Sequence, residues 1–126
     1  MGDAHRNGGN SVSAAISNGA VRILREYTGR GPTQARTIVN RDSVMILFAD
    51  TLTKGERTLA ELGDASVVRD VRHRFQQAMR EEMTELVEAQ LGRKVIAFMS
   101  DYHIDPDMAA EVFVLEPGDE PESATG

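Results

Sequence analysis

The longest regular pattern in the sequence is a stripe of apolar residues between positions 66 and 91 that repeats every three or four residues. Such spacing, kept over about six turns, gives an α-helix one continuous apolar face. Gly92 is placed to end this helix, and we expect the apolar face to pack on a sheet. The stripe consists of Val68, Val71, Phe75, Ala78 or Met79, Met83, Leu86 or Val87, and Leu91.

The remaining patterns predict a first helix over residues 11–27, two β-hairpins and one short helix. The first hairpin covers residues 35–49 with a turn at 40–43, and the second covers 95–115 with a turn at 104–107. Residues 44–49 are apolar throughout, which predicts a central strand covered on both faces. Thr53 and Glu56 form a capping-box pattern that starts the short helix at residues 54–62. Asn10, Ser11 or Ser13 is the expected N-cap of the first helix.

These elements predict an α+β fold in the order α-β-β-α-α-β-β. The two hairpins form one antiparallel sheet, packed on the long amphipathic helix. Residues 11–116 are predicted to be a single domain. Residues 1–10 and the acidic residues 117–126 are predicted to be disordered tails, because both are polar and poor in apolar residues.

Composition narrows the class of protein. The chain has 126 residues, no cysteine and a net charge of -6, of which -4 belongs to residues 116–126 and -2 to the rest. The part of the chain before residue 116 lacks the clustered basic residues that bind nucleic acid, so nucleic-acid binding is not expected. No apolar stretch is long enough to span a bilayer, and residues 1–10 do not resemble a secretory signal, so we expect a cytoplasmic protein without direct membrane insertion.

The first candidate binding site is the segment Gly29-Arg30-Gly31-Pro32-Thr33, together with Arg36. Its spacing is not that of a phosphate-binding loop. Exposed glycine amides beside Arg30 and Arg36 can nevertheless hold a carboxylate, phosphate or bicarbonate. The alternative is that this segment is only a helix stop, at Gly29, followed by a rigid connector.

The second candidate site contains Asp101, His103 and Asp105, which alternate along a predicted strand end. If the strand continues through them, all three side chains project from one face. Two carboxylates and an imidazole suit a divalent metal or a histidine base, but they also suit a solvated turn before Pro106. No motif for an activated nucleophile, a zinc helix or a dinucleotide is present. We therefore expect no catalytic residues, no metal and no cofactor.

Charges on the polar face of the long helix are segregated. The basic residues lie in its first half and the acidic residues in its second, so an antiparallel copy could pair the two halves in a homodimer. A solvated face is the alternative. The residues concerned are Arg69, Arg72, Arg74 and Arg80, followed by Glu81, Glu82, Glu85 and Glu88. His73 is expected to lie at the surface.

Three segments resemble one bacterial family, the MpsC-like proteins, named after the C component of a sodium-translocating membrane-potential-generating system. The resemblance covers about residues 11–117 and rests on motifs that match in order. They are Glu26-Tyr27-Thr28-Gly29-Arg30-Gly31-Pro32-Thr33-Gln34-Ala35-Arg36-Thr37, Leu52-Thr53-Lys54-Gly55-Glu56, and Ala97-Phe98-Met99-Ser100-Asp101-Tyr102-His103-Ile104-Asp105-Pro106-Asp107 with Glu111-Val112-Phe113-Val114-Leu115-Glu116.

The resemblance implies a small accessory or regulatory protein, not an enzyme, of a membrane system that moves cations or imports inorganic carbon. It would work by docking, as a homodimer, with a membrane transport protein as partner and a place at the inner face of the membrane. The alternative hypothesis is a small-anion sensor that uses Arg30, Arg36 and His103. A more distant one is a metal-dependent hydrolase that uses His103 and its neighbouring aspartates.

Overall fold

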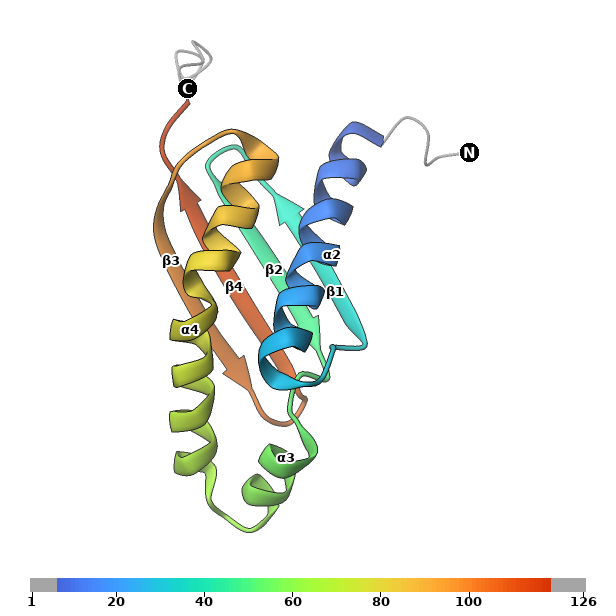
Figure 1. Ribbon diagram of the computed structural model, residues 1–126, viewed down its shortest axis with the longest axis vertical. Coiled ribbons are helices and arrows are strands. Elements are labelled where there is room, and N and C mark those ends of the chain that lie inside the picture. Colours follow the sequence, from blue (N-terminus) through green and yellow to red (C-terminus); the bar gives the residue numbers. More distant parts are fainter. Residues whose placement is uncertain (1–6, 119–126) are drawn as a thin grey trace.

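A computed structural model describes residues 7–118. Its elements follow the predicted order, with three helices and four strands (Figure 1). They are α2 (Asn7–Thr28), β1 (Gln34–Val39), β2 (Ser43–Ala49), α3 (Lys54–Glu61), α4 (Ala65–Leu91), β3 (Val95–His103) and β4 (Met108–Leu115).

The four strands form one antiparallel sheet in the order β1-β2-β4-β3. In the first hairpin β1 pairs with β2, and in the second β3 pairs with β4. The pairing of β2 with β4 joins the two hairpins. The predicted α+β class and the sharing of one sheet by two hairpins are therefore confirmed.

Both long helices lie over the same face of the sheet (Figure 1). The core between them is continuous, because buried residues of α2 and α4 pack on the alternate residues of β2 and β4 that point toward the helices. The helix side chains of this core are Ile16, Ala20, Ile23, Leu24, Met79, Met83 and Val87, and those of the sheet are Val44, Ile46, Phe48, Ala109, Phe113 and Leu115.

The opposite face of the sheet is not covered by any element among residues 7–118. Along β2, fully buried residues alternate with half-buried ones, so only one face is under the helices. The prediction that residues 44–49 are central is correct, but the prediction that both faces are covered is wrong for the single chain. The reason is that α2 and α4 stand side by side on one face.

Local signals placed most element ends correctly. Thr53 and Glu56 form the predicted capping box, with both of its hydrogen bonds present. Gly92 adopts a left-handed conformation (φ 66°) at the end of α4, which a residue with a Cβ adopts at a cost. Helix α2 begins at Asn7, earlier than predicted, so residues 7–10 are helical and not part of a tail. Residues 1–6 and 119–126 of the predicted tails lie outside the described residues.

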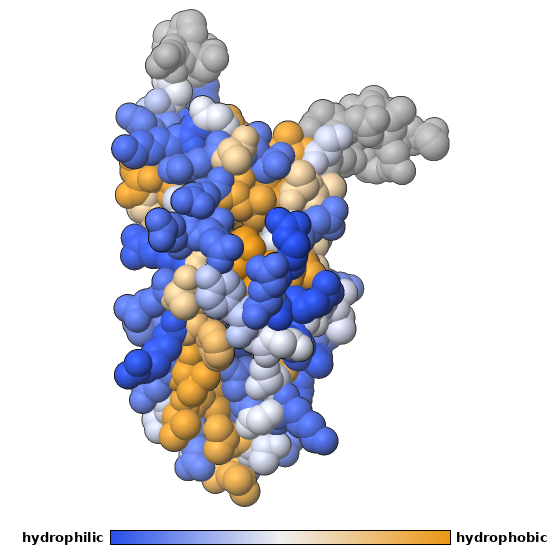
Figure 2. Space-filling model, viewed as in Figure 1, coloured by the Kyte–Doolittle hydropathy of each residue, from blue (hydrophilic) through white to orange (hydrophobic). Residues whose placement is uncertain are grey.

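The helix side of the molecule is mostly hydrophilic, with one hydrophobic strip along the first half of α4 and smaller hydrophobic areas toward the opposite end (Figure 2). Leu62 and Val67, in the connection between these helices and at the start of α4, are 71% and 44% exposed. Phe75 is half-buried at the edge of the core.

We expect Phe113→Ala to lower the free energy of unfolding by about 3–5 kcal/mol, because the ring is fully buried between the sheet and the helices and its loss leaves a cavity. Leu62→Ala, at an exposed position, should change it by less than about 0.5 kcal/mol. Urea unfolding followed by circular dichroism measures both. Equal losses in the two variants would contradict the assigned core.

Candidate functional site

The two charged segments singled out in the sequence lie at the same end of the sheet. Gln34, Ala49, Met108 and His103 occupy one row across the four strands, by the strand register. The loop that carries Arg30 leads into β1 at this row, and the turn at residues 104–107 leaves β3 and enters β4 at the same row.

Asp50 connects the two segments. Arg30 Nε donates a hydrogen bond to the Asp50 carbonyl (3.1 Å), and Asp50 N donates to the Asp107 carbonyl (2.9 Å). The Asp50 side chain also accepts a hydrogen bond from Thr33 Oγ1. Asp50 has a positive φ of 61°, a conformation that aspartate tolerates better than most residues. This backbone kink brings the loop and the turn together.

Asp107 fixes the turn to the rest of the chain. Its carboxylate accepts hydrogen bonds from the backbone amides of Thr51 and Leu52, both at 3.0 Å, and from Thr51 Oγ1 at 3.2 Å. It also forms an ion pair with Arg57 of α3 (3.2 Å), although its side chain is only 5% exposed. One carboxylate therefore holds the β2–α3 connection and α3 against the β3–β4 turn.

Arg72 completes this network from α4. Its guanidinium donates to the Thr51 hydroxyl (2.9 Å), to the Thr51 carbonyl (3.3 Å) and to Glu56 Oε1 (3.4 Å), and lies 5.0 Å from the centre of the Tyr102 ring. Arg72 is 7% exposed. The sequence analysis placed Arg72 on a polar outer face of the helix, either solvated or paired with a second copy, and this is wrong, because Arg72 is buried against the carboxylate of the capping box.

A second buried carboxylate, Glu111 of β4, lies near this network. It is 5% exposed, and its Oε1 atom has no hydrogen-bond partner among the described residues. Burial raises the pKa of Glu111 from 4.5 to about 7, although the nearby Arg72 acts in the opposite direction. A cavity of about 20 Å³ between Arg72 and Glu111 has room for about one water molecule.

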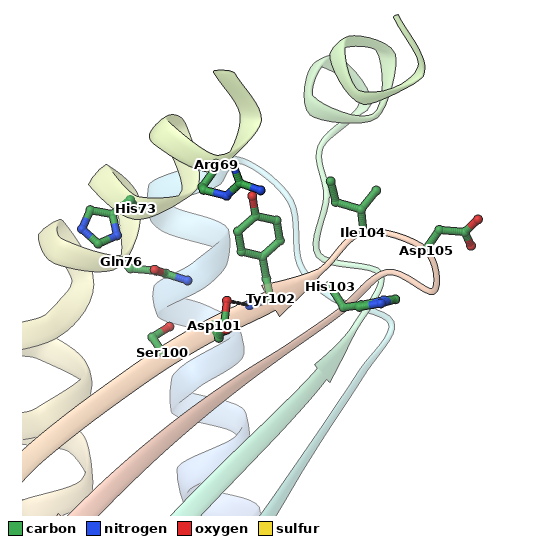
Figure 3. A pocket seen from close by; sticks show the side chains of 9 residues that line it. All are labelled: Arg69, His73, Gln76, Ser100, Asp101, Tyr102, His103, Ile104 and Asp105. Carbon is green, nitrogen blue, oxygen red and sulfur yellow. Dashed lines mark hydrogen bonds between the residues drawn. The ribbon is translucent and has the colours of Figure 1, made fainter. Parts of the chain in front are cut away.

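Outside this buried layer, an open hollow of about 570 Å³ lies between the first half of α4 and the end of β3. Arg69, His73 and Gln76 of α4 face β3 across it (Figure 3). The β3 side and the turn contribute Ser100, Asp101, Tyr102, His103, Ile104 and Asp105. The hollow combines cationic, imidazole and carboxylate groups, which suits a polar partner of mixed charge better than an apolar ligand.

All three residues of the second predicted site border this hollow, although the register places Asp101 and His103 on the face of β3 that points away from the helices. Asp101 and His103 project from the same face because β3 continues through them, whereas Asp105 lies in the turn. His103 Nδ1 is 2.9 Å from the Pro106 carbonyl, which can only accept, so Nδ1 carries the proton and Nε2 faces solvent as the acceptor in the neutral ring. Among residues 7–118, no three His, Asp or Glu side chains form a metal-binding group.

The residues of the first predicted site are dispersed. Arg30 is held by Asp50, Gly31 packs against the Arg25 guanidinium, and Pro32 is half-buried. Arg36 is exposed on β1, which is one edge strand of the sheet, whereas β3 is the other. Three strand spacings, or about 14 Å, separate the two strands. Arg36 and His103 of one chain are therefore not brought together around a small anion.

Arg69, His73 and Gln76 were not predicted to belong to the site. Their spacing of four and three places them on one face of a helix, which is a usable signal, but nothing in the sequence shows that this face lies beside β3. His73 is at the surface, as predicted.

The fold and this polar end define a small α+β domain without a recognisable catalytic constellation among the described residues. A family model described as Na+-translocating membrane potential-generating system (MpsC) matches residues 9–117. The chain belongs to this family, which confirms the resemblance seen in the sequence. No curated protein and no solved structure matches the chain. Within residues 7–118, no helix has the length and apolar content needed to cross a bilayer.

Removing the Asp107 carboxylate should destabilise the fold. Asp107→Ala leaves two buried backbone amides and the Thr51 hydroxyl without their acceptor, so we expect a loss of about 3 kcal/mol in the free energy of unfolding. Asp105→Ala removes a carboxylate two residues away that is exposed, and should cost less than about 0.5 kcal/mol. Chemical denaturation of both variants tests this, and equal effects would rule out the anchoring role.

The raised pKa of Glu111 predicts a pH-dependent stability. Between pH 4.5 and about pH 7 the folded chain holds up to one proton more than the unfolded chain. The free energy of unfolding therefore falls as the pH rises through this window. The fall amounts to about 3 kcal/mol and stops above the folded-state pKa.

Glu111→Gln mimics the protonated side chain and removes this titration. The free energy of unfolding of this variant, relative to that of the wild type, should increase by about 3 kcal/mol as the pH is raised from about 5 to about 8. Glu116→Gln, at an exposed position, is the control. If the difference in the free energy of unfolding between the wild type and Glu111→Gln does not change with pH, the pKa of Glu111 is not raised by folding.

Proposed function

We propose that this protein is a non-enzymatic accessory component of a membrane system that translocates cations or takes up inorganic carbon. It acts from the cytoplasmic side by docking to a membrane protein of that system. Membership of the MpsC family carries the proposal, because that family is described as part of a sodium-translocating, membrane-potential-generating system.

The docking surface in this proposal is the polar end formed by the turn at residues 104–107 and the hollow beside it. His103 and Asp105 are exposed there, while Asp107 behind them is anchored through Thr51 to Arg72. A surface whose backbone is already ordered loses little conformational entropy on binding, which favours recognition of a partner.

The anion-sensor alternative has weaker support. It requires Arg30, Arg36 and His103 to act on one ligand, whereas Arg36 and His103 lie on opposite edge strands and Arg30 Nε is already bonded to Asp50. Thermal stabilisation by bicarbonate or phosphate that is lost in Arg30→Ala would favour the sensor over docking.

Cross-linking in the native cells, followed by identification of membrane proteins recovered with the tagged chain, tests docking. We expect a transport subunit to be recovered with the wild type and to be lost with the double variant His103→Ala, Asp105→Lys. Glu85→Lys makes the same change of charge on the second half of α4 and should leave recovery unchanged. Recovery of no membrane protein with the wild type, or equal recovery with all three forms, would overturn the proposal.

A further inference from the structure

The face of the sheet that α2 and α4 leave uncovered is largely apolar. The strand register places its side chains in rows across the sheet, and the central row is apolar from edge to edge: Ile38, Met45, Val112 and Met99. Ile38 and Met99, at the two ends of this row, are 36% and 54% exposed. An apolar sheet face of this kind is typical of one that packs on a second layer.

The neighbouring row carries the only charges that the register places on this face among residues 34–49 and 95–115. It runs Arg36, Leu47, Ala110 and Asp101, with the basic residue on one edge strand and the acidic residue on the other. About 14 Å of sheet separates the two residues within one chain. In the part of the chain that the structure describes, neither side chain takes part in an ion pair.

We propose that this face is a dimer interface, in which two copies of the chain pack sheet on sheet about a two-fold axis parallel to the strands. Such an axis places β1 of one copy opposite β3 of the other. Arg36 and Asp101 occupy the same row, so each Arg36 then faces the Asp101 of the second copy, and the pair forms twice.

The charges select this orientation among the face-to-face dimers. A two-fold axis perpendicular to the strands would place β1 over β1 and β3 over β3, so Arg36 would not meet Asp101. Aligned sheets pack about 10 Å apart and rotate by about 30°, a displacement that the long arginine side chain can span. The apolar rows then supply the hydrophobic contribution and the two ion pairs fix the register.

The size of the face predicts a modest affinity. Four strands and four rows cover about 500 Å² on each copy, which is at the lower end for specific interfaces. The outer face of α4 is a poorer candidate, because three of its segregated charges are used within the chain: Arg72 is buried, Glu82 accepts from the Tyr27 hydroxyl and Glu88 accepts from the Val95 amide.

Sedimentation velocity of the full chain, from low micromolar to submillimolar concentration, tests the proposal. We expect a dimer for the wild type, and homodimers weakened about tenfold or more in Arg36→Glu and in Asp101→Arg, which each place two like-charged pairs at the interface. An equimolar mixture of the two variants should dimerise again, because both pairs are complementary in the mixed dimer. The double variant should recover for the same reason.

A second pair of variants tests the apolar rows. Met99→Glu, on the uncovered face, should abolish dimerisation, whereas Val67→Glu, exposed on the helix side, should leave it intact. Circular dichroism confirms that each variant is folded. A wild type that stays monomeric at every concentration would overturn the proposal and favour a different protein as the occupant of this face. A dimer that resists the charge reversals, or one that the mixture does not restore, would also overturn it.

Discussion

The buried arginine at position 72 is the interaction on which the rest of the structure depends. A guanidinium removed from water is costly unless it is paired, and the two terminal nitrogens of Arg72 donate to groups from separate parts of the chain, while its Nε has no partner among the described residues. Thr51 follows the first hairpin, Glu56 lies in the first turn of α3, and Tyr102 belongs to β3. One side chain of α4 thus fixes where three elements meet, and a shift of α4 along the sheet would leave a buried charge without partners.

The polar end of the molecule follows from this constraint. Thr51 receives Arg72 on one side and is bonded to Asp107 on the other, so the β3–β4 turn is attached to α4 through a single residue. His103 and Asp105 are displayed on that attached turn. The same arrangement buries Glu111 beside Arg72. Burial raises the pKa of the Glu111 carboxyl more than Arg72 lowers it, which makes the stability of the domain sensitive to pH near neutrality.

The two faces of the sheet have different roles. The face under the helices contains the core, while the face away from them keeps apolar side chains without a covering element in the described chain. Docking uses the turn at one end of the sheet, self-association uses its uncovered face, and His103 lies where the two surfaces meet. A dimer of this kind would present two docking ends, one from each copy.

The sequence by itself determined the elements and their order, because periodicity, the Thr53–Glu56 box and Gly92 are local signals that need no information from distant residues. It also placed Asp101 and His103 correctly on one strand face. Only the tertiary structure decided that Arg72 is buried, that α4 lies beside β3, and that one face of an apolar strand stays open. These depend on contacts between residues far apart in the chain, which a helical or alternating pattern does not encode.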